Sequence, residues 1–503
     1  MALAAGLATL GHALTSIALP FGWDHGIMAS AASPIAHGGL VYVDGWDMKG
    51  PFAYLPFAFV EMLFGRTMWG TRILDLVLMV VGCLAFYRLV AVLSGKVTGV
   101  LAALALYYWI AAGGFFFTAE PEIWATVLTA VAFGPVLARA GNPDIRGLML
   151  AGVIVGCIGL MKPVYWSFGI TPLLVIALAV GPSLQRRAIL AIILGLSAAL
   201  PVALTIAWFA LKGGLAELIE VHLLYNLESY GAMETGITWI DGFAEFLSRP
   251  TIALLLPFAA LGAWNLRGKP VVFWAVMGWI AANLVAIIMQ AKFYYYHWLP
   301  LYPPLLLLGA IGATTLWRER AAAHAPAFVT ITATLAFFAQ ICALPFHDVA
   351  KAAFYLGLKR SPELYYNSYS HRPGGDPEEQ NYNVADEMAA ARYIAANTRP
   401  DEGLFVWGNN ATAAYLADRP NPTRFPMEMP LSVDGPYRPQ YRAEAMAGLT
   451  ARPPVYIIVG INWWTSKSRA EVLEDFPEFS AFLNNKYRYE RSFGAIDLYR
   501  LDR

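Results

Sequence analysis

Apolar runs long enough to cross a membrane recur along the first 345 residues of the chain. An α-helix needs about 20 apolar residues to span the hydrocarbon core of a bilayer. Runs of roughly that length lie near residues 2–20, 68–92, 97–113, 122–138, 147–161, 164–181, 188–211, 250–265, 271–290, 298–316 and 325–344. We therefore predict a polytopic α-helical membrane protein with about 11 transmembrane helices.

The composition agrees with a membrane protein and excludes several other classes. Of the 503 residues, 58% are hydrophobic and only 14% are charged, which is more apolar than a water-soluble domain can bury. The 35 basic and 35 acidic residues cancel, so nothing indicates a nucleic-acid partner. The three cysteines lie within apolar runs, which favours packing roles over a disulfide framework or a zinc site.

Basic residues stand beside alternate short connections between the runs, and this pattern predicts the orientation. They are Arg88, Lys96, Arg139, Arg146, Arg186, Arg187, Arg267, Lys269, Arg318 and Arg320. The positive-inside rule assigns these connections to the cytoplasm. The opposite, extracytoplasmic side then receives outer loops 21–66 and 212–248 and everything after residue 345.

The composition changes after the last apolar run. Residues 346–382 include NSYSHRPGGDPEEQNYN, which is typical of a linker. Residues 383–503 contain the helical pattern VADEMAAARYIAANT, two short buried strands, GLFVWG and PVYIIVG, and a terminal hairpin, RYERSFGAIDLYRL. We predict a transmembrane module over residues 1–345, a linker, and an extracytoplasmic α/β domain at the C-terminal end.

Asp24 follows the first apolar run by a few residues, between Trp23 and His25. A carboxylate at the membrane surface, partly removed from water, suits a general base acting on a hydroxyl or amine acceptor. The alternative is an ordinary polar residue at the end of a helix. The residue type alone leaves both interpretations open.

The motif DGWDMKGP places Asp44, Asp47 and Lys49 close together before Pro51. Glycine allows sharp turns and proline suits the start of a helix, so these charged side chains can point to one place. Lys49 suits a phosphate, and an aspartate suits a sugar hydroxyl or the lysine itself. The alternative is a local Asp47–Lys49 ion pair that caps the following helix.

Glu120 and Glu122 flank Pro121 at the start of another apolar run. Two neighbouring acids can hold a divalent cation or orient an acceptor. They can also simply stabilise the positive end of the helix that begins there. We predict no cofactor with certainty, and a divalent cation is one possibility.

Lys162 and Lys292 are lysines at extracytoplasmic ends of apolar runs, where the positive-inside bias predicts few. Together with His297 they fit a cradle for a lipid-linked phosphate. Snorkelling lysines within an aromatic belt, formed by the tyrosines at 294–296 and Trp298, are the alternative. We expect a binding role for Lys292 beside His297.

Common nucleotide-binding and hydrolase motifs are absent from the sequence. It has no Walker loop, no GxSxG elbow, no HExxH and no GxGxxG after a strand. A reaction on the extracytoplasmic side must then use a donor that is already activated. A sugar linked to polyprenyl phosphate meets that requirement.

Several segments resemble the GT-C membrane glycosyltransferases, in particular bacterial proteins similar to protein O-mannosyltransferases, lipid A aminoarabinose transferases and rhizobial galacturonosyl transferases. WDHGIMASAASPIAHGGLVYVDGWDMKGPFAY resembles the first outer loop of that family. GLMKPVYW is similar to its lysine-bearing turn, and KFYYYHWLPLYPPLLLL to its outer HY-x-L-P-x-x-P segment. FVWGNNATAAYLADRPNPTRF resembles the W-G-x-x-x-x-x-Y-x-x-A-x-R-x-x-x-x-R pattern of the soluble tail.

The resemblance implies a role for each candidate residue. Asp24 is implied to be the catalytic base, and the phosphate-holding positions fall on Lys162, Lys292 and His297. Glu120 or Glu122 matches a second acidic position near the acceptor. Asp44, Asp47 and Lys49 are expected to organise the loop, with Lys49 also binding the donor. Many relatives have a second acid where this chain has His25, which can act as a proton partner or donate a hydrogen bond to the leaving phosphate.

The function implied is that of a hexosyl or pentosyl transferase in a bacterial inner membrane. It would move one sugar from a polyprenyl-phosphate donor to a glycan, lipid or protein acceptor on the outer face, inverting the anomeric centre, with the tail domain as an acceptor-facing cover. An O-antigen ligase or polymerase, and a transporter or flippase for lipid-linked glycans, are the alternatives. A transporter predicts charges deep within spans and internal repeats. The sequence has few such charges, Asp75 being the main one, and no clear repeat.

Overall fold

A computed structural model describes residues 2–179, 181, 183–233, 236–319, 324–371, 382–460 and 469–502. The chain forms two compact units, each built from several segments. Unit 1 comprises Met1–Leu74, Trp208–Met233 and Val349–Arg503, and unit 2 comprises Asp75–Ala207 and Glu234–Asp348. The first outer loop and the C-terminal domain therefore belong to the same compact unit.

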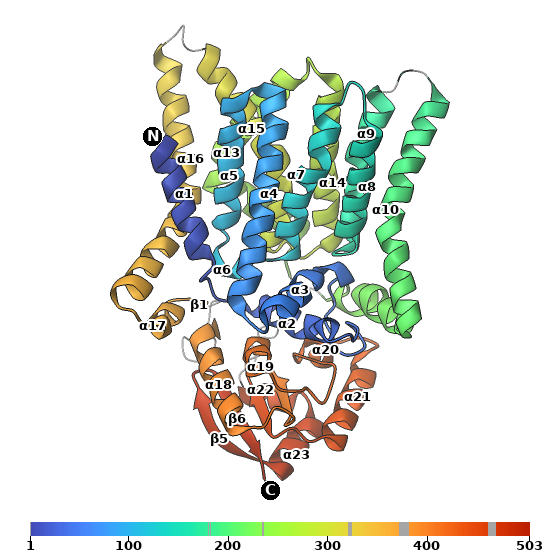
Figure 1. Ribbon diagram of the computed structural model, residues 1–503, viewed down its shortest axis with the longest axis vertical. Helices are drawn as coiled ribbons and strands as arrows, with labels where there is room; N and C mark the ends of the chain where they lie inside the picture. The colour runs from blue at the N-terminus through green and yellow to red at the C-terminus, as the bar shows by residue number, and fades with distance from the viewer. Residues whose placement is uncertain are drawn as a thin grey trace. The chain divides into compact units, whose positions relative to one another are not determined.

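Unit 2 is a bundle of helices that run side by side (Figure 1). Its elements are α4 (Met68–Ser94), α5 (Lys96–Ala111), α6 (Gly114–Phe117), α7 (Pro121–Ala138), α8 (Ile145–Gly159), η2 (Pro163–Gly169), α9 (Ile170–Ala179), α10 (Leu184–Lys212), α12 (Trp239–Ser248), α13 (Pro250–Leu266), α14 (Pro270–Gln290), η4 (Tyr295–Leu301), α15 (Tyr302–Glu319) and α16 (His324–Lys351). The first residues of α4 and the last residues of α10 and α16 belong to unit 1.

Glycines allow two helices of the bundle to approach closely. A Cβ atom at Gly262 of α13 would overlap the Leu308 carbonyl of α15, and one at Gly312 of α15 would overlap the Phe258 carbonyl of α13. Small residues at such contacts are a common basis of helix packing in membranes, where hydrophobic burial between helices is weak.

Among the residues that the structure describes, six helices are long and apolar enough to cross a membrane, or seven if the bent pair α12 and α13 counts as one span. The predicted membrane class is confirmed, but the predicted count of about 11 is not. Each predicted run does lie on helix, yet α5 has 16 residues and α8 has 15, short of the roughly 20 that a span needs. Hydropathy locates apolar helices but does not measure their length.

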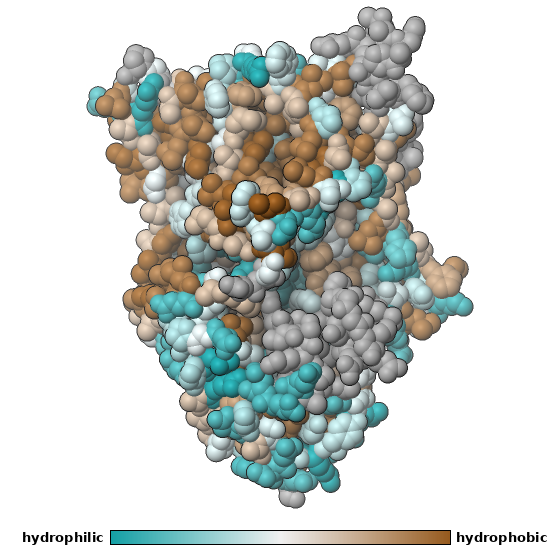
Figure 2. All heavy atoms as spheres, turned by 180° about the vertical axis from the view of Figure 1, so that it is seen from behind, coloured by the Kyte–Doolittle hydropathy of each residue, from teal (hydrophilic) through white to brown (hydrophobic). Residues whose placement is uncertain are grey.

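Apolar side chains gather on the surface of the helical bundle, as Figure 2 shows in brown. Helix α10 illustrates the pattern: Leu196, Leu200 and Leu204 lie four residues apart and are each more than half exposed. Residues at that spacing share one helix face. An exposed leucine stripe of this kind suits contact with lipid rather than with water.

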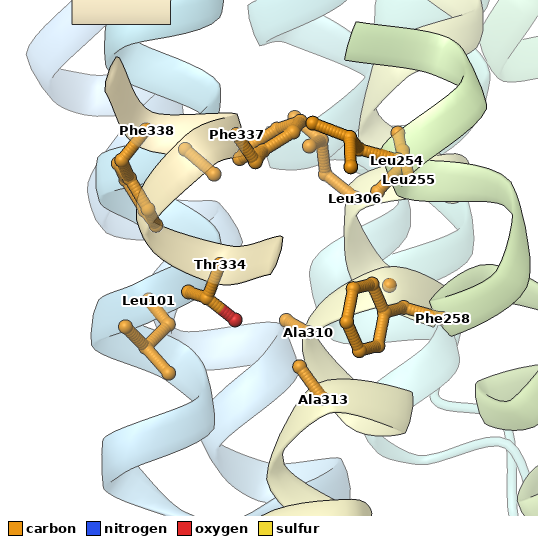
Figure 3. Close-up of a pocket in the computed structure, with 12 residues that line it drawn as sticks. Leu101, Leu254, Leu255, Phe258, Leu306, Ala310, Ala313, Thr334, Phe337 and Phe338 are labelled. Atoms are coloured by element: carbon orange, nitrogen blue, oxygen red, sulfur yellow. The ribbon is translucent and has the colours of Figure 1, made fainter. Parts of the chain in front are cut away.

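Unit 2 also contains an apolar pocket between α5, α13, α15 and α16, whose empty volume of about 450 Å³ includes space open to the outside. Figure 3 shows leucine and phenylalanine side chains around it, with the hydroxyl of Thr334 as the polar group. The lining carries no ionisable side chain. This pocket can therefore hold hydrocarbon, but it offers no acid, base or cation for a reaction.

Unit 1 begins with α1 (Ala2–Ser16) and includes the short helices of the first outer loop. Its other elements outside the C-terminal domain are α2 (Trp23–Ala36), η1 (Pro51–Ala53), α3 (Leu55–Phe64), α11 (Leu215–Glu217), η3 (Leu218–Tyr230), η6 (Ala352–Leu358), α17 (Pro362–Asn367), β1 (Ser370–His371) and β2 (Tyr382–Asn383). Helix thus continues through much of the predicted linker, whose residues 372–381 lie outside the described residues.

The C-terminal domain is a four-stranded sheet covered by helices. The strand order is β3 (Leu404–Trp407), β4 (Tyr456–Val459), β6 (Ile496–Leu501) and β5 (Tyr487–Phe493), with β3 parallel to β4 and the other pairs antiparallel. The helices are α18 (Val384–Asn397), α19 (Ala411–Ala417), α20 (Met429–Ser432), α21 (Arg438–Ala451), α22 (Arg469–Glu474) and α23 (Pro477–Lys486). The predicted strands and terminal hairpin are confirmed.

Candidate active site

Three charged side chains of unit 1 meet in the first outer loop. The Lys49 Nζ atom lies 3.9 Å from Asp24 Oδ2 and 3.5 Å from Asp47 Oδ2. The Asp24 and Lys49 side chains are 17% and 10% exposed, whereas the Asp47 side chain is fully buried. We call these three residues the Asp24 cluster, and Asp24 is its more exposed carboxylate.

The start of α2 places Asp24 in this cluster. Gly22 caps the helix in an extended conformation, and Asp24 falls in the first turn. The unpaired backbone N–H groups of a helix N-terminus favour a negative charge there. The backbone thus holds the Asp24 carboxylate close to its helix start, while Lys49 approaches it from the following loop.

His25 helps to define the beginning of this helix. The backbone N–H of Gly22 donates a 2.7 Å hydrogen bond to His25 Nδ1, and the ring packs 5.5 Å from that of Phe21. The side chain is fully buried. Because Nδ1 accepts a hydrogen bond, the neutral ring carries its proton on Nε2. The structure therefore places His25 as a local helix cap beside Asp24.

Asp44 is separate from the Asp24 cluster. It is exposed, and its Oδ2 atom accepts a 2.8 Å hydrogen bond from the backbone N–H of Leu40. Its own backbone N–H donates to the Leu40 carbonyl, so the two residues close a turn. The loop-organising role of Asp44 stays a prediction, and this turn is the contact through which it would act.

Asp47 is the buried partner of Lys49. Burial raises the pKa of the Asp47 carboxyl above its usual range, and the positive charge of Lys49 opposes that shift. Its Oδ1 atom accepts a hydrogen bond from the Met48 backbone. A buried carboxylate without a nearby cation is costly, so Asp47 and Lys49 depend on each other.

Two tyrosines that the sequence did not single out hold the Lys49 backbone. The hydroxyls of Tyr42 and Tyr54 both donate hydrogen bonds to the Lys49 carbonyl, at 2.6 and 3.0 Å. Both rings are fully buried. Nothing in the sequence distinguishes them from ordinary core tyrosines, because their partner is a backbone atom.

A second polar cluster lies in unit 2, around Lys162. The Lys162 ammonium donates hydrogen bonds to Glu122 Oε1 and, at 3.2 Å, to Gln290 Oε1. It also lies 5.4 Å from the centre of the Tyr296 ring. The Glu122 side chain is fully buried and that of Lys162 is 18% exposed. We call this group the Lys162 cluster.

Helix ends bring the members of the Lys162 cluster together. Glu122 is in the first turn of α7, Lys162 directly precedes η2, and Gln290 is the last residue of α14. Glu120 immediately precedes α7 and is 1% exposed, but its side chain does not cap the helix. Sequence reasoning missed Gln290, since a single amide at a helix end carries no recognisable pattern.

Lys292 and His297 lie beside this cluster. Each is only 3% exposed, and burial lowers the pKa of Lys292. His297 lies within electrostatic range of the positive charges of Lys162 and Lys292. Its ring packs against Tyr294 and Tyr296. A snorkelling lysine would extend its ammonium into water, and the burial of Lys292 does not agree with that interpretation.

The acidic residues of both clusters are balanced by lysines. In the part of the chain that the structure describes, no three His, Cys, Asp or Glu side chains converge as metal ligands would. Lys49 supplies the positive charge beside the two carboxylates of the Asp24 cluster. Lys162 neutralises Glu122 in the same way.

Solved structures with a similar fold are known. ArnT from Cupriavidus metallidurans bound to undecaprenyl phosphate matches with a TM-score of 0.63 and 13% identity, over 98% of this chain and 96% of that chain. The archaeal oligosaccharyltransferase AglB from Archaeoglobus fulgidus, in complex with an inhibitory peptide and a dolichol-phosphate, matches with a TM-score of 0.52 and 12% identity, over 99% and 74%. The chain has the GT-C fold of membrane glycosyltransferases.

A family comparison points the same way as the GT-C fold. The model described as dolichyl-phosphate-mannose-protein mannosyltransferase matches residues 48–208. This range includes Lys49, Glu122 and Lys162, whereas Asp24 precedes it and Gln290 and Tyr296 follow it. No curated protein matches this GT-C chain in sequence.

Proposed function

We propose that this GT-C protein transfers a single sugar from a polyprenyl-phosphate carrier to a glycan, lipid or protein acceptor. The observation that carries the proposal is the Asp24 cluster, in which a partly exposed carboxylate lies 3.9 Å from a lysine ammonium. A carboxylate held in this way, within reach of substrate, suits a general base. The GT-C fold supports this reaction class.

The relatives support a lipid-linked phosphate as the donor's carrier. ArnT is bound to undecaprenyl phosphate, and AglB is in complex with a dolichol-phosphate and an inhibitory peptide. A sugar phosphate ester of such a lipid is already activated, so the transfer needs no nucleotide. This agrees with the absence of nucleotide-binding motifs from the sequence.

In the proposed step Asp24 takes the proton from the acceptor hydroxyl or amine. The acceptor atom forms a bond to the anomeric carbon while the bond from that carbon to the phosphate oxygen breaks. The electron pair leaves with the polyprenyl phosphate, and the anomeric centre inverts. Lys49 lies beside Asp24, and its positive charge can attract the phosphate of the donor.

The Lys162 cluster has the chemistry to hold the phosphate. Glu122 and Gln290 accept hydrogen bonds from two of the three N–H groups of the Lys162 ammonium. The third N–H group can donate to a phosphate oxygen. Burial lowers the pKa of Lys292, so an arriving phosphate would favour its protonated form. His297 can donate a further hydrogen bond, and Glu120 is the remaining acid for orienting an acceptor.

The proposed setting is a bacterial inner membrane. The predicted orientation places the basic connections in the cytoplasm and the outer loops with the C-terminal domain on the extracytoplasmic side. The lipid-facing leucine stripe of α10 and the apolar pocket suit a protein surrounded by acyl and isoprenoid chains.

The test is transfer activity of the purified protein in lipid nanodiscs. A panel of undecaprenyl-phosphate sugars is supplied with lipid, glycan and peptide acceptors, and products are analysed by mass spectrometry and by NMR for the anomeric configuration. We expect Asp24→Asn to lower transfer by at least about 100-fold, while the exposed control Asp401→Asn stays within about threefold of the original. Full activity of Asp24→Asn, or a retained anomeric configuration, would overturn the proposed mechanism.

A further inference from the structure

An arginine of the C-terminal domain forms hydrogen bonds with the backbone of the loop that carries Lys49. Arg424 Nη1 donates a 2.6 Å hydrogen bond to the Tyr42 carbonyl, and the Trp46 backbone N–H donates a 2.7 Å hydrogen bond to the Arg424 carbonyl. The two contacts run in opposite directions between the same segments. Together they fix the backbone on both sides of the turn that leads into Asp47.

Arg424 is itself tightly held, so it can act as a rigid support. Its side chain is 8% exposed, forms two hydrogen bonds with Glu444 at 2.8 and 2.9 Å, and reaches Glu220 at 3.2 Å. The guanidinium also lies over the Tyr441 ring, 5.1 Å from its centre. A planar guanidinium with carboxylates and an aromatic face around it has little freedom to move.

A continuous set of hydrogen bonds connects Arg424 to Lys49. Arg424 holds the Tyr42 carbonyl, and the Tyr42 hydroxyl donates to the Lys49 carbonyl. The Lys49 ammonium then contacts Asp24. The position of the proposed base is thus tied, through one tyrosine, to an arginine more than three hundred residues away in the sequence.

A fully buried tryptophan strengthens the same attachment. Trp46 packs edge-on against Tyr225 and Tyr441, with ring centres 4.9 and 5.8 Å apart, and lies 6.2 Å from Phe425. Offset and edge-on aromatic pairs add to the energy of burial. Tyr225, Phe425 and Tyr441 therefore also hold the segment that ends at Asp47.

Helix α2, which carries Asp24, also rests on the C-terminal domain. The Ser30 hydroxyl donates to the Ala411 carbonyl of α19, and a Cβ atom at Gly26 would overlap Thr412. The two polypeptide segments that contribute Asp24 and Lys49 are therefore both packed on the same domain.

We propose that Arg424 is a positioning residue of the active site, and that the C-terminal domain sets the Lys49 and Asp24 geometry through Arg424 and Tyr42. This inference rests on the proposed function. It also gives a role to the last arginine of FVWGNNATAAYLADRPNPTRF, the tail motif singled out in the sequence. The other arginine, Arg419, has its hydrogen bonds to described residues within that domain, to Thr398 and to the carbonyls of Ala395, Ala417 and Asp418.

The first experiment measures the position of Lys49 without any substrate. The full-length protein in nanodiscs is treated with an N-hydroxysuccinimidyl acetate, which acylates accessible amines, and labelling of Lys49 is quantified by peptide mass spectrometry against exposed Lys486. We expect Arg424→Gln to raise Lys49 labelling about fivefold or more, because its segment opens. The matched control Arg419→Lys should leave the ratio unchanged.

The second experiment measures transfer by the same variants. We expect Arg424→Gln to lower kcat by at least about 10-fold through misplacement of the reacting groups, with the KM for the undecaprenyl-phosphate sugar changed less. Arg424→Lys should recover part of the loss. Tyr42→Phe should lower kcat less, since Tyr54 also holds the Lys49 carbonyl, and adding it to Arg424→Gln should cost little more, as for members of one coupled set.

The outcomes separate this inference from the proposed function. Unchanged Lys49 labelling in Arg424→Gln, or effects of Arg424→Gln and Tyr42→Phe that multiply in full, would overturn the positioning role. Raised labelling with undiminished transfer would uphold the contact but overturn the proposed use of Lys49 and Asp24. An equal loss of kcat in Arg419→Lys would show a general effect of domain stability and would also overturn the inference.

Discussion

The Lys49 ammonium lies 3.9 Å from Asp24 and also faces the buried Asp47. One lysine thus pairs with two carboxylates of different burial, one partly exposed and one enclosed in the loop. The enclosed carboxylate holds the lysine, and the lysine lies beside the partly exposed one. In the proposed mechanism the enclosed pair is structural and the partly exposed Asp24 is the base.

Replacement of Lys49 should therefore lower the transfer rate by more than the loss of one positive charge near the substrate would. We expect Lys49→Met to lower transfer by about 100-fold or more, because Asp24 loses its partner and Asp47 its counter-charge. Lys49→Arg should keep a measurable fraction, since the charge remains although the longer fork fits differently. Initial rates in nanodiscs, with Lys212→Met as the exposed control, check this, and normal rates for Lys49→Met would contradict it.

The contact between α2 and α19 leads to a stability prediction. A Cβ atom at Gly26 would overlap the side chain and backbone of Thr412, whereas one at Gly11 of α1 would meet nothing within 4 Å. We expect Gly26→Ala to destabilise unit 1 by about 1–3 kcal/mol through overpacking, and Gly11→Ala to be neutral or slightly stabilising. Hydrogen exchange of the α2 and α19 amides measures the difference. Equal protection in the two variants would show that the helices are not in close contact.

Features of the fold that depend on residues close together in the sequence could be predicted, and features that depend on distant residues could not. Apolar runs locate the helices of the bundle because burial in lipid demands many consecutive apolar residues. They do not predict that α5 and α8 are shorter than a typical span. Helix length depends on the capping residues and glycines that end each helix, and a hydropathy average over many residues does not detect them.

The same contrast applies to the candidate site. Asp47 and Lys49 are close in sequence, so their pairing was predictable from the local pattern. The partners Arg424 and Gln290 were not, because their contacts join segments far apart in the chain. Only the fold brings a C-terminal arginine to the carbonyl of Tyr42.

A buried acid in the C-terminal domain leads to a prediction about pH. Glu428 is fully buried, and neither carboxyl oxygen has a hydrogen-bond partner among the described residues. Burial raises the pKa of Glu428 from 4.5 to about 8. Because the folded-state pKa is higher than the unfolded one, the folded state binds more protons between these values, and stability falls as the pH rises through about 8.

Replacement with glutamine should remove this pH-dependent loss. We expect Glu428→Gln to stabilise the domain at pH 8.5 by on the order of a few kcal/mol relative to the original chain, and to make little difference near pH 4.5. Exposed Glu474→Gln is the matched control. Hydrogen exchange of the β3 amides, compared between variants at each pH, provides the measurement. A difference that stays constant across pH would show that Glu428 is not the titrating group.

The Glu122 and Lys162 pair allows structural and binding roles to be separated. Glu122 is fully buried and Lys162 is its cation, so Lys162→Met alone should destabilise unit 2 by about 3–5 kcal/mol by leaving a buried charge unpaired. Adding Glu122→Gln removes that charge, and stability should recover. Binding of undecaprenyl phosphate, and with it transfer, should not recover, because the N–H group proposed for the phosphate is still missing. Thermal unfolding and undecaprenyl phosphate binding in nanodiscs measure the two properties, and a double variant with normal binding would restrict Lys162 to a structural role.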